Sequence, residues 1–279
     1  MHIWERRNVV ILLAASSTLF AQGEASPARS QSLSSAPDVR QIVEASIVAT
    51  QRGWQARRHY TYIEREESRR RDLDGNLKSG DVTVSRTILV DGVPFDRLIE
   101  HNGQPPSPDE ERKQNTKIDK LKRESPQQRA ARLRKDEEED MSLVRELPKA
   151  FDFQLVGEDV IKGRPAYVLQ ATPHPGYRPQ GKYGRMFSKV EGKLWIDKED
   201  MGWVKADGQV IQPFSMGLFL ARMMRGSRIT MEQTRVDNGI WMPEHIEVRA
   251  AAKIFFVKDL IIEQVLSYSE YSLPQAAAR

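Results

Sequence analysis

Apolar and polar residues alternate in the stretch Gly192-Lys193-Leu194-Trp195-Ile196-Asp197, and similar stretches occur at Ala166-Tyr167-Val168-Leu169-Gln170-Ala171 and Gly239-Ile240-Trp241-Met242-Pro243. A period of two is typical of strands with one buried face. Turn residues such as Asp237-Asn238-Gly239 recur at intervals of roughly 8 to 15 residues. The region from Phe151 to Tyr271 is therefore predicted to form a large antiparallel sheet. Only Met216 to Met224 is ambiguous between a short helix and an apolar strand.

Upstream of this region, the sequence predicts one helix followed by three strands. Asp38 can cap a helix that reaches about residue 57, because Val39, Ile42, Val43 and Ile47 keep a helical spacing. From His59 the period changes to that of strands, with turns at residues 72–76 and 102–103. These strands are predicted to form an antiparallel meander.

The segment 107–149 has a different composition. Ser107 and Ser125 are each followed by proline and, three residues after the serine, by Glu110 or Gln128, which is the pattern of a helix start. Residues 109–140 contain ten basic and ten acidic side chains and few apolar ones. We interpret 107–149 as a charged, solvated helical insertion. A mobile lid or docking arm is the alternative.

The first residues resemble an export signal. Arg6 and Arg7 precede a short apolar run that ends near the small residue Ala21, as in a secretory signal peptide, and the run is too short for a comfortable membrane span. We expect cleavage after Ala21, or else after Ala25, with a retained anchor as the alternative. The predicted divisions are a signal peptide at 1–21, a flexible leader at 22–37, a β domain at 38–274 and a tail at 275–279.

Composition limits the classes of function. The 279 residues are 39% hydrophobic, which is enough for a real core, and the net charge of +4 is a weak argument for a nucleic-acid partner. Cysteine is absent, which excludes disulfides, thiol catalysis and the lipid-bearing cysteine of a bacterial lipoprotein. A soluble, monomeric periplasmic protein is expected.

Common enzyme signatures are missing. The sequence has no H-E-x-x-H, no G-x-S-x-G and no phosphate-binding loop. Ser215 has Pro213 where a nucleophile elbow has glycine, and the acidic run 136–140 lacks the glycine of a calcium loop. The scattered histidines are interpreted as surface or hydrogen-bonded residues. We therefore predict no enzyme activity, no cofactor and no metal site.

Three motifs carry a resemblance to a known superfamily. Gly163 to Pro173 with its central Tyr-Val-Leu, Gly192 to Asp197 with Trp-Ile-Asp, and Gly239 to Pro243 resemble the outer-membrane lipoprotein-sorting superfamily, the LolA/LolB-like proteins, and especially its larger members. That resemblance implies an α+β, mainly β fold: an incomplete antiparallel β-barrel with helices across its open side and an apolar cavity for acyl chains or lipoproteins.

Large apolar residues are the candidate ligand contacts, because a lipid cavity needs apolar walls. They are Trp195, Trp203, Phe214, Phe219, Met223 and Trp241. Core packing is the alternative role for each of them. The resulting hypothesis is a non-catalytic carrier or chaperone that binds lipid acyl chains or lipoproteins, with peripheral membrane contact possible. The alternative is a protein-interaction module like the envelope-stress regulators that share this fold.

Overall fold

The computed structural model describes residues 38–179, 184–216, 221–254 and 258–274. The predicted signal peptide, leader and tail lie outside these ranges, as does Phe219. The helices are α1 (Val39–Arg57), α2 (Pro108–Arg123), α3 (Pro126–Ala150), α4 (Gly184–Phe187) and the short 3-10 helix η1 (Asp237–Gly239). The strands are β1 (Thr61–Arg71), β2 (Leu77–Val90), β3 (Val93–His101), β4 (Phe151–Ile161), β5 (Arg164–Pro173), β6 (Val190–Asp197), β7 (Trp203–Val210), β8 (Phe214–Met216), β9 (Ala221–Met223), β10 (Arg228–Arg235), β11 (Trp241–Ile254) and β12 (Lys258–Ser272).

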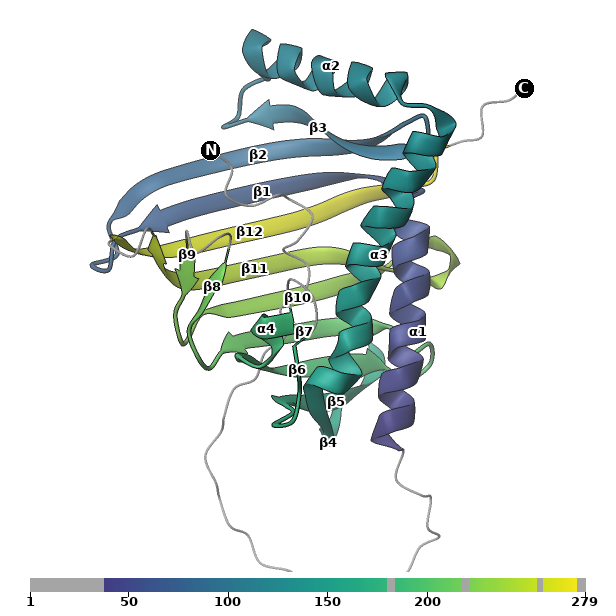
Figure 1. The fold of residues 1–279 in the computed structure, drawn as a ribbon, viewed down its shortest axis with the longest axis vertical. Coiled ribbons are helices and arrows are strands. Elements are labelled where there is room, and N and C mark those ends of the chain that lie inside the picture. The colour runs from purple at the N-terminus through teal and green to yellow at the C-terminus, as the bar shows by residue number, and fades with distance from the viewer. Residues whose placement is uncertain (1–37, 180–183, 217–220, 255–257, 275–279) are drawn as a thin grey trace, which may run out of the picture.

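The strands form one large antiparallel sheet with α1 and α3 lying side by side across one face (Figure 1). The strand order is β3-β2-β1-β12-β11-β10-β7-β6-β5-β4, with β9 joining β11 and pairing β8. In the described residues β3 and β4 end this order without pairing to each other, so the sheet does not close. The predicted incomplete antiparallel barrel is confirmed. None of the described helices is both long and apolar enough to cross a membrane.

The first helix begins where its cap predicts. The Asp38 carboxylate accepts a hydrogen bond from the Arg40 backbone amide at 2.9 Å, which satisfies one of the free amides of the first turn. Its buried stripe includes Ile42, Val43 and Gly53. A Cβ on Gly53 would lie 3.2 Å from the Trp241 carbonyl oxygen, so glycine allows the helix to approach the sheet closely. The stripe sets the distance between α1 and the sheet.

The two helices of the charged segment begin as predicted but differ in burial. Capping boxes form at Ser107 and Ser125. Along α2 only Ile118 is buried. In the last turns of α3, by contrast, Val144, Leu147 and Ala150 are at most 1% exposed. The C-terminal half of α3 is therefore part of the core, whereas α2 is attached at the surface.

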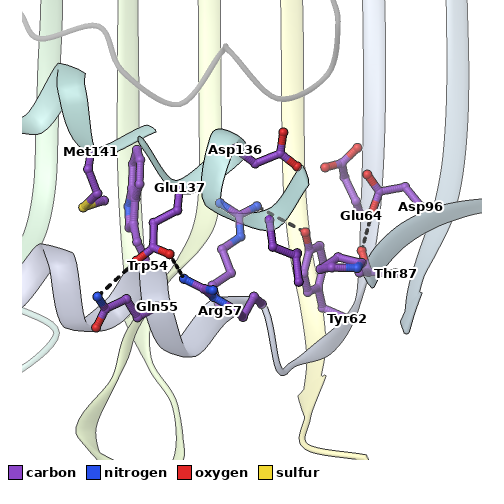
Figure 2. A pocket seen from close by; sticks show the side chains of 13 residues that line it. Trp54, Gln55, Arg57, Tyr62, Glu64, Thr87, Asp96, Asp136, Glu137 and Met141 are labelled. Carbon is purple, nitrogen blue, oxygen red and sulfur yellow. Dashed lines mark hydrogen bonds and ion pairs between the residues drawn. The ribbon is translucent and has the colours of Figure 1, made fainter. Parts of the chain in front are cut away.

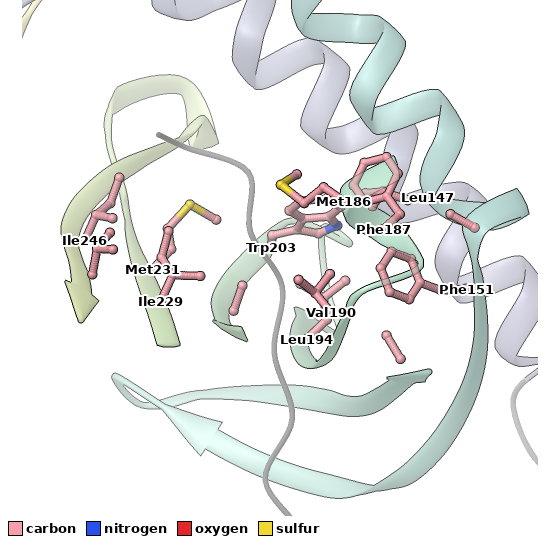
Figure 3. Packing of buried hydrophobic residues seen from close by; sticks show 14 of the residues in the cluster. Leu147, Phe151, Met186, Phe187, Val190, Leu194, Trp203, Ile229, Met231 and Ile246 are labelled. Carbon is pink, nitrogen blue, oxygen red and sulfur yellow. The ribbon is translucent and has the colours of Figure 1, made fainter. Parts of the chain in front are cut away.

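The main core lies between the helices and the sheet face that they cover (Figure 3). The alternation seen in the sequence sends every second side chain of β6 into it, including Leu194 at 1% and Ile196 at 0% exposure. The ring of Phe187 packs edge-on against Phe151, with centroids 5.7 Å apart. Burial of each such side chain contributes about 1.5–3 kcal/mol. This core extends along the sheet from β4 to β12 and reaches Tyr62 of β1.

The three sequence motifs meet at one polar network beside this core. Arg164 donates two hydrogen bonds to the fully buried Asp197, at 2.6 and 2.8 Å. The indole nitrogen of Trp241 donates to the neighbouring Asp200 at 2.8 Å. A Cβ on Gly202 would lie 1.9 Å from the Trp241 ring, so only glycine fits there. The motifs thus have a structural role in this chain.

Polar contacts attach α2 to the edge of the sheet. His101 of β3 contacts Asp81 of β2 through Nε2 at 2.7 Å and Glu110 of α2 through Nδ1 at 2.6 Å. The Asp81 and Glu110 carboxylates raise the pKa of His101 above its ordinary value of 6.5. Hydrogen bonds from Ser107, and then from His101, lower the pKa of Glu110 from 4.5 to about 2. Both shifts favour the charged pair in the folded state.

The attachment of α2 is expected to depend on pH. The His101 contribution is complete below a pH of about 6.5 and is lost as the pH rises through the raised pKa, while the Glu110 contribution is complete above about 4.5 and is lost towards about 2. Hydrogen-exchange protection of the α2 amides should therefore be greatest between about pH 4.5 and 6.5. In the variant His101→Gln, the protection of the α2 amides should no longer decline above this pH range. Equal wild-type protection factors at about pH 6 and about pH 9 would contradict the expectation.

Candidate ligand-binding cavity

A cavity of about 160 Å³ lies between α1, α3 and the first three strands (Figure 2). It is next to the main core, with which it shares the side chain of Tyr62. Its wall consists of Trp54, Gln55 and Arg57 of α1, Arg58 directly after α1, Tyr62 and Glu64 of β1, Thr87 of β2, Pro94 and Asp96 of β3, and Leu133, Asp136, Glu137 and Met141 of α3. An apolar cavity of about 150 Å³ accommodates a molecule the size of benzene. The space is therefore sufficient for a small ligand or for one end of a longer one.

One part of the wall is apolar. Trp54 and Met141 lie near each other in Figure 2, and Leu133 and Pro94 also line the cavity. Met141 is 4% exposed, so it joins the cavity to the buried surface of α3. An indole, a thioether and a leucine side chain together provide the kind of surface that binds hydrocarbon.

Ion pairing connects the two helices at the other part of the wall. Arg58, the C-cap residue of α1, lies 2.8 Å from Glu137 of α3, and the Gln55 side-chain amide donates to the same carboxylate at 3.2 Å. Arg58, and then Gln55, lower the pKa of Glu137 below its ordinary value. Glu137 therefore stays ionised over the neutral range and holds the helices together across the cavity.

The guanidinium group of Arg57, in the cavity wall, lies against the rings of Tyr62 and Tyr268. The guanidinium carbon is 5.4 Å from the ring centre of Tyr62 and 5.7 Å from that of Tyr268. A guanidinium N–H also donates to the Tyr62 hydroxyl at 3.3 Å. A cation over an aromatic face is stabilised by the ring quadrupole. Burial raises the pKa of Tyr268 well above its ordinary value, so the Tyr268 ring remains neutral. The arrangement keeps a fixed positive group in the cavity wall.

Carboxylates nevertheless predominate in the polar wall. Four carboxylates, from Glu64, Asp96, Asp136 and Glu137, line the cavity together with two guanidinium groups, from Arg57 and Arg58. Glu64 is only 6% exposed, and Asp96 accepts a hydrogen bond from Thr87 at 2.5 Å. The cavity is therefore amphipathic, with a hydrocarbon-like part and a polar part in which acidic groups outnumber basic ones.

A smaller hollow of about 20 Å³ lies on the other side of Trp54 and Arg57, which line both spaces. The Thr50 hydroxyl is buried there and has no hydrogen-bond partner among the described residues. One water needs about 10–15 Å³ in a polar site. The hollow can thus hold a water on Thr50, and Trp54 separates it from the larger cavity.

The residues proposed from the sequence do not gather in the larger cavity. Trp203 and Trp241 line the small hollow. Met223 is 2% exposed in the core and Phe214 packs against the core. Trp195 is half-buried and donates to Asp159 at 3.0 Å. Their role in ligand binding stays a prediction, and that of Phe219 concerns a residue outside the described ranges.

Trp54, Arg57 and Leu133 were not identified as candidates from the sequence. Trp54 continues the helical stripe that includes Ile47 and Thr50, so its inward direction could have been inferred. Leu133 is one of the few apolar residues in a charged helix. That these residues face one cavity depends on the packing of segments about 80 residues apart, which periodicity does not reveal.

Comparisons with known proteins give structural similarity alone. No protein-family model matches the sequence, and no curated protein matches it. Among solved structures, the chain is similar to a LolA superfamily protein from Nitrosomonas europaea, with 14% identity, 86% of this chain and 96% of that chain covered, and a TM-score of 0.32. A putative outer membrane lipoprotein-sorting protein domain from Vibrio parahaemolyticus shares 9% identity, with 85% and 95% covered and a TM-score of 0.30.

The Pseudomonas aeruginosa MucA/MucB complex structure also matches, at 13% identity, 81% and 94% coverage and a TM-score of 0.22. The superfamily named from the sequence motifs is thus among these matches. TM-scores this low leave the ligand and partner of this chain to be inferred from its own residues.

In the described part of the chain, no group of three or more histidine, aspartate or glutamate side chains could hold a metal ion.

Proposed function

We propose that this protein is a non-catalytic periplasmic carrier or chaperone that binds the acyl chain of a lipid or lipid-modified protein in the cavity between α1, α3 and the sheet. The observation that carries the proposal is the amphipathic wall of that cavity. Trp54, Leu133 and Met141 offer surface for hydrocarbon, and the charged part offers hydrogen-bond partners for a polar end group. Reversible binding in such a site requires no covalent chemistry.

The size of the cavity indicates how such a ligand would enter. A group of about six carbons fills it, and each methylene removed from water contributes about 0.8 kcal/mol. Six methylenes then contribute about 5 kcal/mol, whereas a micromolar dissociation constant requires about 8 kcal/mol. A carrier of useful affinity therefore has to bury more of the chain than the cavity holds in this structure.

The N-terminal half of α3 is the element that can make room. Its C-terminal half is fixed in the core by Val144 and Leu147. The N-terminal half is held mainly by ion pairs, including Arg58 with Glu137 and Arg129 with Asp91 at 3.4 Å. Exposed or half-exposed pairs of this kind contribute little, typically about 0–1 kcal/mol each. We therefore expect this half of α3 to move away from β3 when an acyl chain binds.

A protein-interaction or envelope-stress regulatory module is the second candidate. The observation that favours it is the number of acidic and basic side chains in the cavity wall, six in all from Arg57, Arg58, Glu64, Asp96, Asp136 and Glu137. Such a wall can also bind the side chains of a polypeptide. The two candidates differ in what fills the apolar part of the cavity.

Filling the cavity with a larger side chain tests the proposal. In titrations with a fluorescent fatty acid, Leu133→Trp is expected to weaken binding at least about tenfold, because the indole occupies space that the chain needs. Leu73, which is 65% exposed, gives the matched control. Leu73→Trp should bind as the wild type does. Wild-type affinity in a folded Leu133→Trp variant would contradict the proposal.

A further inference from the structure

A side chain of α2 covers the outer edge of β3, the edge that does not pair with β2. The Leu98 amide donates to the Gln114 side-chain oxygen at 2.6 Å, and the Gln114 side-chain nitrogen donates to the Leu98 carbonyl at 3.3 Å. A neighbouring antiparallel strand makes the same pair of bonds to one residue. Because β3 is the last strand of the sheet, this edge would otherwise offer its backbone groups to another chain.

The helix that covers the edge is weakly attached. Among its residues only Ile118 is buried, and its polar contacts to the sheet include those of Glu110 with His101 and of Gln114 with Leu98. Burial of a single isoleucine is a small contribution compared with that of a packed helix face. A competing strand that bonds to β3 can therefore replace α2 without disturbing the core.

The charge on β3 indicates which type of side chain an added strand should present. Arg97 lies directly opposite Arg86 on β2, and like charges in this position repel. Arg86 has a partner in Glu270 at 3.1 Å, while Arg97 is exposed. An acidic side chain on an added strand would complement Arg97. A second copy of β3 paired symmetrically around this residue would instead bring two Arg97 side chains together.

We propose that the edge of β3 is a docking site for an extended peptide segment with an acidic side chain, and that α2 covers this site until the peptide displaces it. Backbone pairing at Leu98 supplies affinity, and Arg97 supplies selectivity. Neither contact depends on acyl binding, so this inference and the proposed function can fail separately.

The test uses a fluorescein-labelled nonapeptide of alternating threonine and valine with glutamate at its centre. Two control peptides have lysine at the centre, or N-methyl groups on alternate amides that abolish strand pairing. The wild-type protein should bind the glutamate peptide more tightly than either control. Gln114→Ala should tighten this binding by about fivefold to tenfold, because a competing pair of hydrogen bonds is lost. Lys113→Ala, on the same helix, should leave it unchanged.

Reversing the charge of Arg97 on β3 provides a second, independent test. Arg97→Glu should exchange the preference, so that the lysine peptide binds more tightly than the glutamate peptide. In the wild type, the glutamate peptide should slow hydrogen exchange in β3 and accelerate it in α2. Equal binding of the N-methylated peptide, an unchanged preference in Arg97→Glu, or self-association of Gln114→Ala without peptide binding would overturn the proposal.

Discussion

Replacement of Asp197 by alanine is expected to lower the free energy of unfolding by about 3–5 kcal/mol, since it leaves a guanidinium group without its buried partner. The Asp197 side chain is 0% exposed and accepts two bonds from Arg164, together with backbone amides of Glu199 at 2.9 Å and Asp200 at 3.1 Å. Burial alone would raise the pKa of this carboxyl, but the bonds from Arg164 and the two amides leave it below its ordinary value. The fold therefore favours the ionised form of Asp197.

Denaturant unfolding of Asp197→Ala and of a surface control measures this effect. Asp109 pairs with Arg112 on the exposed face of α2, so Asp109→Ala should change the unfolding free energy by no more than about 0.5 kcal/mol. If Asp197→Ala unfolded within about 1 kcal/mol of the wild type, the network where the three motifs meet would not have the structural role that its geometry indicates.

Truncation of Trp203 should cost about as much, roughly 3–5 kcal/mol, because a buried indole is removed and a cavity remains. Trp203 is 5% exposed, and its indole nitrogen donates to the buried Ser46 hydroxyl at 3.1 Å. The variant Trp203→Ala would also leave that hydroxyl without this donor. The larger part of the expected loss is the lost packing between β7 and α1.

Thermal melts and fatty-acid titrations distinguish a core role from a ligand role for this residue. Trp195→Ala is the matched control, since Trp195 is half-buried and contacts Asp159 and Lys205 away from the core. We expect Trp203→Ala to melt far below Trp195→Ala, while the protein that remains folded binds the probe normally. Normal stability with lost binding would place Trp203 in the ligand site, as the sequence had suggested.

Local signals in the sequence were sufficient for most elements. Asp38, Ser107 and Ser125 marked helix starts because each supplies an oxygen that satisfies free backbone amides. The alternation in residues 190–197 gave the strand β6. Such signals act over a few residues, so they can be read without knowledge of the tertiary structure.

The position of the cavity could not be read in the same way. Large aromatic residues such as Trp203 and Trp241 were natural candidates for an apolar wall, yet they line a hollow of only about 20 Å³. The larger space depends on how α3 lies against α1, through pairs such as Arg58 with Glu137. A periodic pattern shows that a side chain faces inward, but not whether it meets protein or open space.

Binding of acyl chains in the cell by the cavity beneath α1 and α3 is tested most directly by native mass spectrometry of the protein purified from its own envelope, before and after delipidation. We expect a mass increment of one lipid or lipid-modified species that delipidation removes and that Leu133→Trp fails to retain. Protein that carries no lipid but holds a stoichiometric polypeptide partner, equally well in the wild type and in Leu133→Trp, would contradict it.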